Sequence, residues 1–196
     1  IVNTKLLEQA GYKISDIRDF ASLKSIAEDI HSRADELGFD AFTSSGLDDT
    51  SAWRFSGHLA NMPLFYEFRD EKVVEQPAAL KGTYLNNFRQ IWDLYIHNSA
   101  TAPADQITAT GDDAKAAFTG EKAVFWQQGS WEYAGLQAAG ITDVTMIPIY
   151  CGVPGEENAG LCSGTENCWA INAKAPQEDI DASLEFLYWV VTSDAG

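Results

Sequence analysis

Basic side chains are scarce in this sequence. Its 196 residues contain 13 Lys and Arg against 29 Asp and Glu, which gives a formal net charge of −16. A chain this acidic repels phosphate backbones and anionic membrane surfaces. We therefore expect no nucleic acid partner.

Long hydrophobic runs are missing too, since no stretch approaches the roughly 18 apolar residues that a membrane-spanning helix needs. The chain starts at Ile1 with neither a methionine nor a signal peptide, and we expect that it has been cut from something larger. A hydrophobic fraction of 45% and an aromatic fraction of 12% indicate a globular chain with a sizeable core. Residues 1–196 are expected to form a single domain.

Cysteine and histidine are rare, with three of each. Cys151, Cys162 and Cys168 fall close together, but no histidine lies near them to complete a zinc ligand set, so we expect no metal site. In an oxidising compartment one pair closes a loop, with Cys151 and Cys162 the best candidates. The alternative is three reduced cysteines that pack as small hydrophobic side chains.

Several catalytic motifs are also missing. The run "QGSWE" (128–132) lacks the second glycine of a Gly-x-Ser-x-Gly nucleophile elbow. No glycine-rich phosphate loop or dinucleotide fingerprint is present, so no cofactor is expected. A glycosidase needs a pair of carboxylates, and Glu132, Glu157 and Glu166 could supply one. Spacing alone does not exclude this alternative.

Hydrophobic periodicity predicts the regular elements. Helices are expected over 3–11, 20–37, from about 51 to near Pro63, and over 81–98, 110–120, 130–139 and from 176 onward. Strands are expected at the start of "DAFTSSGLDD" (40–49), in "KAVFWQ" (122–127), in "DVTMIPI" (143–149) and in "CWAIN" (168–172). This order predicts an α/β fold with a small sheet and a thick helical layer.

The first candidate site lies where the strand of "FWQQGSWEYAGLQAAGI" (125–141) becomes a helix. Ligands of open α/β sheets gather beyond the carboxyl ends of strands. There Gly129 admits close approach to the backbone, Ser130 starts the helix, and Trp131 offers a flat apolar face beside amide donors. This pairing suits a sugar, whose ring faces are apolar and whose rim carries hydroxyls. The alternative is that Trp131 fills the core.

Two further loops are candidates. Trp53 and Arg54 lie near the start of a helix after a polar loop, where Arg54 either binds vicinal hydroxyls or a carboxylate, or pairs with Asp48 or Asp49. The polar loop "GEENAGLCSGTEN" offers hydrogen-bonding groups from Thr165, Glu166 and Asn167, or is an ordinary surface loop.

Three stretches together resemble the family 1 extracellular solute-binding proteins of ABC sugar importers, which include maltose-binding protein. They are "AFTGEKAVFWQQGSWEYAGLQAAGI", "VTMIPI" and "GTENCWAINAKAPQEDIDASLEFLYWVVTSDAG". The opening "NTKLLEQAGYKISDIRDFASLKSIAEDI" is similar to the same family's segment after the first crossing between lobes. The cysteines and "WRFSGHLANMPLFYEF" depart from the general family pattern.

The resemblance implies a lobe of the type II periplasmic-binding-protein fold with a mixed sheet, truncated at both ends, whose first lobe is missing. It implies a clamp that binds a sugar or oligosaccharide, hydrolyses nothing and presents the ligand to an ABC permease. The tryptophan of the family's Gly-Ser-Trp turn stacks on sugar, a role that carries over to Trp131, while Gly129 and Ser130 line the cleft. The resemblance further implies a monomer that is lipid-anchored on the extracellular face or periplasmic.

Overall fold

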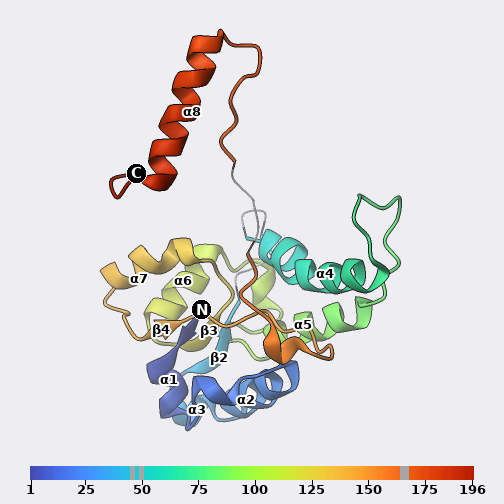
Figure 1. Cartoon of the computed structure of the whole chain (residues 1–196). Helices are drawn as coiled ribbons and strands as arrows, with labels where there is room; N and C mark the ends of the chain where they lie inside the picture. The colour runs from blue at the N-terminus through green and yellow to red at the C-terminus, as the bar shows by residue number, and fades with distance from the viewer. Residues whose placement is uncertain (45–46, 49–50, 164–167) are drawn as a thin grey trace. The chain divides into compact units, whose positions relative to one another are not determined.

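The computed structural model describes residues 1–44, 47–48, 51–163 and 168–196, and the chain forms two compact units, Ile1–Cys162 and Ser163–Gly196. In the first unit, helices alternate with short strands (Figure 1). Its helices are α1 (Thr4–Gln9), α2 (Phe20–Ser32), α3 (Ala34–Leu37), α4 (Ala60–Glu71), α5 (Leu85–His97), α6 (Gly111–Thr119) and α7 (Tyr133–Ala138). Its strands are β1 (Val2–Asn3), β2 (Asp40–Thr43), β3 (Ala123–Trp126) and β4 (Val144–Thr145).

The four strands form one mixed sheet in the order β2-β3-β1-β4. Strands β2 and β3 run parallel, with Phe42 beside Phe125, whereas β1 is antiparallel to both β3 and β4. Every residue of β2 and β3 is buried, as expected for parallel strands covered on both faces. The predicted fold class, α/β with a small mixed sheet and a thick helical layer, is confirmed.

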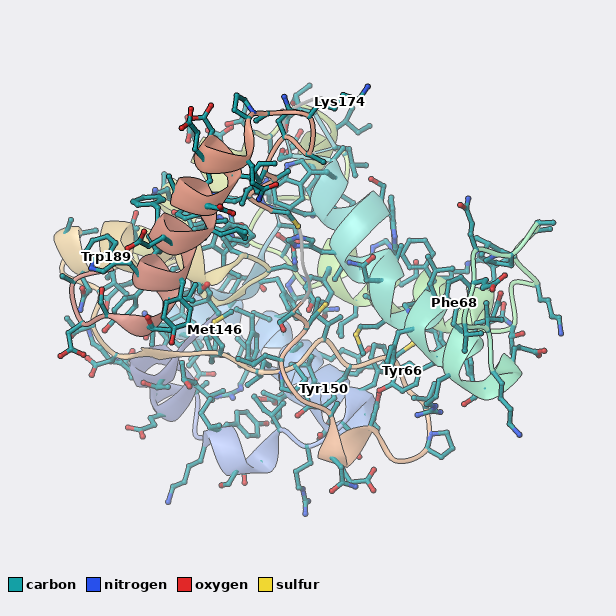
Figure 2. The ribbon with its side chains drawn as sticks, turned by 45° about the horizontal axis from the view of Figure 1, so that its top comes forward. Tyr66, Phe68, Met146, Tyr150, Lys174 and Trp189 are labelled. Atoms are coloured by element: carbon teal, nitrogen blue, oxygen red, sulfur yellow. The ribbon has the colours of Figure 1, made fainter. Side chains whose placement is uncertain are left out.

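Two hydrophobic clusters hold the first unit together. The larger one joins the sheet to α1, α2, α4 and α5, and it includes Tyr66 of α4 and Tyr150 of the segment after β4, which Figure 2 labels. The smaller one packs Trp126 of β3 against Phe118 of α6 and Leu136 of α7. Both clusters fix the position of β3, whose carboxyl end leads directly into the Trp131 turn.

Capping residues explain where the early helices begin. The side chain of Asn3 accepts a hydrogen bond from the backbone N–H of Leu6 at the start of α1. Asp19 and Ser22 form a reciprocal cap at the start of α2. The helix expected over 20–37 is interrupted at Arg33, which separates α2 from α3, and Gly38 ends α3 with a positive φ of 78°.

The helix expected to stop near Pro63 continues instead to Glu71. A π-helix over Arg54–Leu59 leads into α4, and Pro63 is the fourth residue of α4. The helical backbone is continuous from Arg54 through Leu59 into α4, and the π-helix changes the hydrogen-bonding pattern just before the proline, which has no backbone N–H to donate. The prediction of a helix end at this proline is therefore wrong.

The second unit contains α8 (Gln177–Thr192), which begins one residue after the predicted start at Pro176; Pro176 is its N-cap, and Glu178 and Asp179 lie in its first turn. The strand expected at "CWAIN" is not formed, because residues 168–172 adopt no regular structure. An apolar run becomes a strand only when a neighbouring strand satisfies its backbone groups. Within the described ranges, no helix is both long and apolar enough to cross a membrane.

Candidate functional site

The site begins at the carboxyl ends of the two parallel strands β2 and β3. The chain after β2 leads to Trp53, and the chain after β3 leads to Trp131. Since parallel strands end at the same edge of a sheet, segments that are far apart in the sequence meet here. Two of the three predicted candidate segments are thus brought together.

Trp131 lies in a single 3-10 turn, Ser130–Glu132, that precedes α7. Its side chain is 55% exposed, so it does not fill the core. A Cβ atom built on Gly129 would lie 2.1 Å from Cζ3 of Trp131, which shows that the indole occupies the space beside the glycine. One part of the ring is therefore covered by backbone while the rest is open to solvent.

Trp53, His58 and Trp131 form an aromatic cluster. The centroids of the two indole rings are 6.3 Å apart, with their planes at 41°. The His58 ring lies edge-on to the Trp53 ring, with their centroids 4.6 Å apart. The centroids of the His58 and Trp131 rings are 6.0 Å apart. Trp53 is 40% exposed, so both indoles of this bent pair present surface to solvent.

Arg54 is a buried side chain that contacts the Trp53 ring of this cluster. Its guanidinium carbon lies 4.5 Å from the centroid of the Trp53 ring, within the range of a cation–π contact. Burial lowers the pKa of Arg54, whereas the carboxylates of Glu132 and Asp48 favour its charged form. Its Nε atom is buried and has no hydrogen-bond partner in the part of the chain that the structure describes.

Amide and carboxylate groups surround the aromatic rings. The amide nitrogen of Gln127 lies 3.0 Å from Nδ1 of His58, and because an amide nitrogen only donates, Nδ1 is the acceptor. The amide oxygen of Gln127 is buried without a hydrogen-bond partner among the described residues. Glu132 forms an ion pair of 2.8 Å with Lys115.

Backbone amides of the Trp131 turn are partly used within the turn itself. The N–H of Gly129 donates to the Gln128 side chain at 3.2 Å, and the N–H of Glu132 donates to the carbonyl of Gly129 at 3.2 Å. Ser130 is exposed beside the indole. The Ser130 hydroxyl and the indole of Trp131 are the exposed side-chain groups of this turn.

The third predicted loop cannot be placed with the others. Thr165, Glu166 and Asn167 lie outside the described residues, so their assignment as binding residues stays a prediction. The cysteines upstream and downstream of that loop, Cys162 and Cys168, are exposed. Cys151 is a buried free thiol, so the predicted pairing with Cys162 is not formed.

Sequence reasoning missed His58 and Gln127 as members of the site. No motif in the sequence singles out His58, whose Nδ1 contacts an amide and whose ring contacts two indoles. Gln127 directly follows a buried strand, and that position at the carboxyl end of β3 is the signal that points to it. The contact between the two residues depends on a fold that periodicity alone does not determine.

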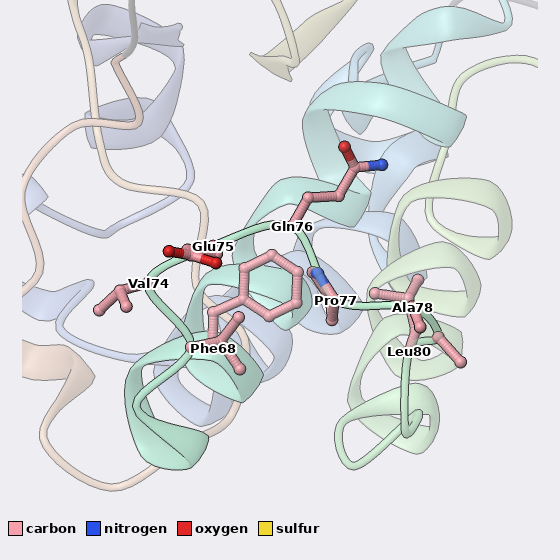
Figure 3. A pocket seen from close by; sticks show the side chains of 9 residues that line it. Phe68, Val74, Glu75, Gln76, Pro77, Ala78 and Leu80 are labelled. Atoms are coloured by element: carbon pink, nitrogen blue, oxygen red, sulfur yellow. The ribbon is translucent and has the colours of Figure 1, made fainter.

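A separate hollow of about 560 Å³ lies at the end of α4. It is lined by Phe68 and by the loop over residues 73–80, as Figure 3 shows. Glu75 and Gln76 are its polar side chains, and Val74 at its rim is 93% exposed. Because one open loop forms nearly all of its wall, this hollow does not enclose a ligand as a binding site does.

Comparison with protein-family models gives one match that spans almost the whole chain. Residues 1–195 match the family described as "Bacterial extracellular solute-binding protein". The chain belongs to this family. Comparisons with curated proteins and with solved structures gave no significant match.

Membership in the bacterial extracellular solute-binding proteins gives the chain an extracellular binding role, with a transported ligand and an ABC permease as the membrane partner. Members of the family are binding proteins rather than enzymes, and the alternative of a glycoside-processing enzyme gains no support. Of its candidate carboxylates, Glu132 is paired with Lys115 and Glu157 is exposed on a 3-10 turn. Among the described residues, no group of three or more His, Cys, Asp or Glu side chains is placed to hold a metal ion.

Proposed function

We propose that this solute-binding protein captures a sugar or oligosaccharide and that Trp131 and Trp53 are its stacking platforms. The observation that carries the proposal is the exposed, bent pair of indoles beyond the carboxyl ends of β2 and β3. Indole faces match the apolar C–H patches of pyranose rings. Ser130 and Gln127 would supply hydrogen bonds to the hydroxyl rim.

Charge in the described part of the site favours a neutral ligand. The positive charge of Arg54 is opposed by Glu132 and Asp48, and Glu132 is also paired with Lys115. An anionic ligand would meet these carboxylates on a chain of net charge −16. A sugar needs no net charge at the site, because hydroxyl groups bind through hydrogen bonds.

We further propose that the chain acts as the second lobe of a two-lobed clamp whose first lobe it does not contain. Ligand contacts with both lobes would stabilise a closed form, which an ABC permease then accepts. The resemblance of the "GSW" turn and of the flanking segments to family 1 sugar-importer proteins supports this arrangement. On the same basis we propose a monomer that is lipid-anchored at the cell surface or periplasmic.

Intrinsic tryptophan fluorescence, titrated with a panel of neutral mono-, di- and trisaccharides, tests this proposal when it is combined with an assay for reducing ends. We expect a saturable change with at least one saccharide and no release of reducing ends. A set of titrations without any response, or hydrolysis of the saccharide that binds, would contradict it. The full-length protein is the better sample, because a clamp binds its ligand with two lobes.

A further inference from the structure

The backbone at Gly129 does not itself require glycine. Its φ of −97° and ψ of 171° lie in the extended region that every L-residue adopts. Yet a Cβ atom there would lie 2.1, 2.2 and 2.4 Å from Cζ3, Cη2 and Cε3 of Trp131. Carbon atoms in contact are about 3.5–4.0 Å apart, so only a hydrogen atom fits between this backbone and the indole.

We propose that Gly129 is a positioning residue, whose missing side chain lets the six-membered part of the Trp131 indole settle against the backbone. This seat sets the ring 6.3 Å from Trp53 and 6.0 Å from His58. The effect on ligand binding rests on the proposed function, whereas the placement of the ring does not. Gly129 then acts on the ligand through Trp131 and not by direct contact.

Two contacts of Glu132 hold the backbone of the turn in place, so the turn cannot shift together with the indole. The backbone N–H of Glu132 donates to the carbonyl of Gly129 at 3.2 Å, and the Glu132 carboxylate is tied to Lys115 at 2.8 Å. A methyl group at position 129 must therefore be accommodated by rotation of the Trp131 side chain. That rotation would take the ring out of the aromatic cluster.

Other glycines provide a contrast that makes the inference testable. Among the residues that the structure describes, none has a heavy atom within 4 Å of the position that a Cβ of Gly160 would take, and the φ of Gly160 is not positive. Gly160→Ala is therefore a matched control for the general effects of replacing glycine by alanine. Its melting temperature and its spectra are expected to equal those of the wild type.

The experiment is a double-mutant cycle with Gly129→Ala and Trp131→Ala, read by circular dichroism and by melting temperature without ligand. Two indole rings this close couple their electronic transitions and give a circular dichroism signal of their own. Trp131→Ala removes this signal, and we expect Gly129→Ala to remove it as well. We expect Gly129→Ala to lower the melting temperature of the wild type, but to leave it unchanged or slightly raised when Trp131 is already alanine.

An equal loss of melting temperature in both backgrounds would overturn the proposal, because it would assign the glycine a backbone role. An unchanged indole coupling in Gly129→Ala would do the same. A further outcome is that Gly129→Ala does not fold. Recovery of folding by the added Trp131→Ala change would then support packing of the indole against Gly129, and continued failure would overturn it. Since both readouts are free of ligand, a failure of the carbohydrate proposal leaves them as they are.

Discussion

The indole rings of Trp53 and Trp131 lie 6.3 Å apart, although they come from separate loops after β2 and β3. Two parallel strands that end side by side bring these loops together. The pair is too close to hold a further ring between its faces, since each stacking contact needs about 3.5–4.0 Å. A ligand would lie across the two rings, which makes their relative position decisive for the site.

Arg54 is expected to stabilise the Trp53 platform through its planar guanidinium. Lysine at this position keeps the charge but loses stacking on the indole, so Arg54→Lys should lower the free energy of unfolding by about 1 kcal/mol. Urea denaturation measures this effect, with the exposed Arg18→Lys as control. Equal stability of Arg54→Lys and the wild type would argue against the stacking contact.

Glu156 is expected to be the main polar tie between α2 and the loop over 151–156. Its buried carboxylate accepts from the backbone N–H groups of Phe20 and Cys151 at 2.7 Å and of Gly152 at 2.8 Å. Glu156→Gln weakens these hydrogen bonds and places an amide N–H donor against backbone N–H groups. The free energy of unfolding should therefore fall by about 1.5–3 kcal/mol. The neighbouring exposed Glu157→Gln is the matched control, and equal losses in both variants would refute this role.

Glu67 is expected to make stability depend on pH in the acid range. Backbone N–H groups, that of Lys81 first and then that of Thr83, hold the pKa of the Glu67 carboxyl below its ordinary value of 4.5. The stabilisation is therefore complete above pH 4.5 and is lost as the pH falls through the lowered pKa.

The measurement is the melting temperature of the wild type and of Glu67→Gln across this range. Their difference should be largest near neutral pH and should shrink below pH 4.5. Glu75→Gln, which removes an exposed carboxylate from the following loop, should show no such trend. A difference between the wild type and Glu67→Gln that stays constant down to low pH would contradict the account.

Cys151 is expected to resist thiol reagents in the folded protein. Burial, with a smaller contribution from Glu156, raises the pKa of its thiol to about 12, so almost no thiolate exists at neutral pH. Alkylation followed by mass spectrometry should label Cys151 only after denaturation. Labelling of Cys151 in the native protein as fast as in the denatured one would show that the thiol is accessible.

Local sequence signals were sufficient for most elements of the fold. Capping groups and apolar periodicity predicted α1, α5 and α6 closely, and the apolar run "KAVFWQ" predicted the buried strand β3. The errors occurred where tertiary structure overrides local preference. Pro63 is accommodated within α4, and "CWAIN" has strand-forming residues but no strand.

The site was predictable in part for the same reason. Trp131 follows a buried strand and a glycine, which is a local signal for a loop at the carboxyl end of a sheet. The contact of Trp53 with Trp131, and of His58 with Gln127, depends on how two distant loops meet. No spacing in the sequence encodes those distances.

The most direct test of a stacking role for Trp131 is the affinity of Trp131→Ala, compared with Trp189→Ala, for the best saccharide of the fluorescence panel. Both tryptophans are exposed, but Trp189 belongs to α8 of the second unit, where its nearest aromatic neighbour is Phe186. By analogy with base–aromatic stacking, at about 1–3 kcal/mol per ring, isothermal titration calorimetry should show binding about 5- to 150-fold weaker for Trp131→Ala. Trp189→Ala should bind like the wild type. Full affinity in a correctly folded Trp131→Ala variant would contradict the account.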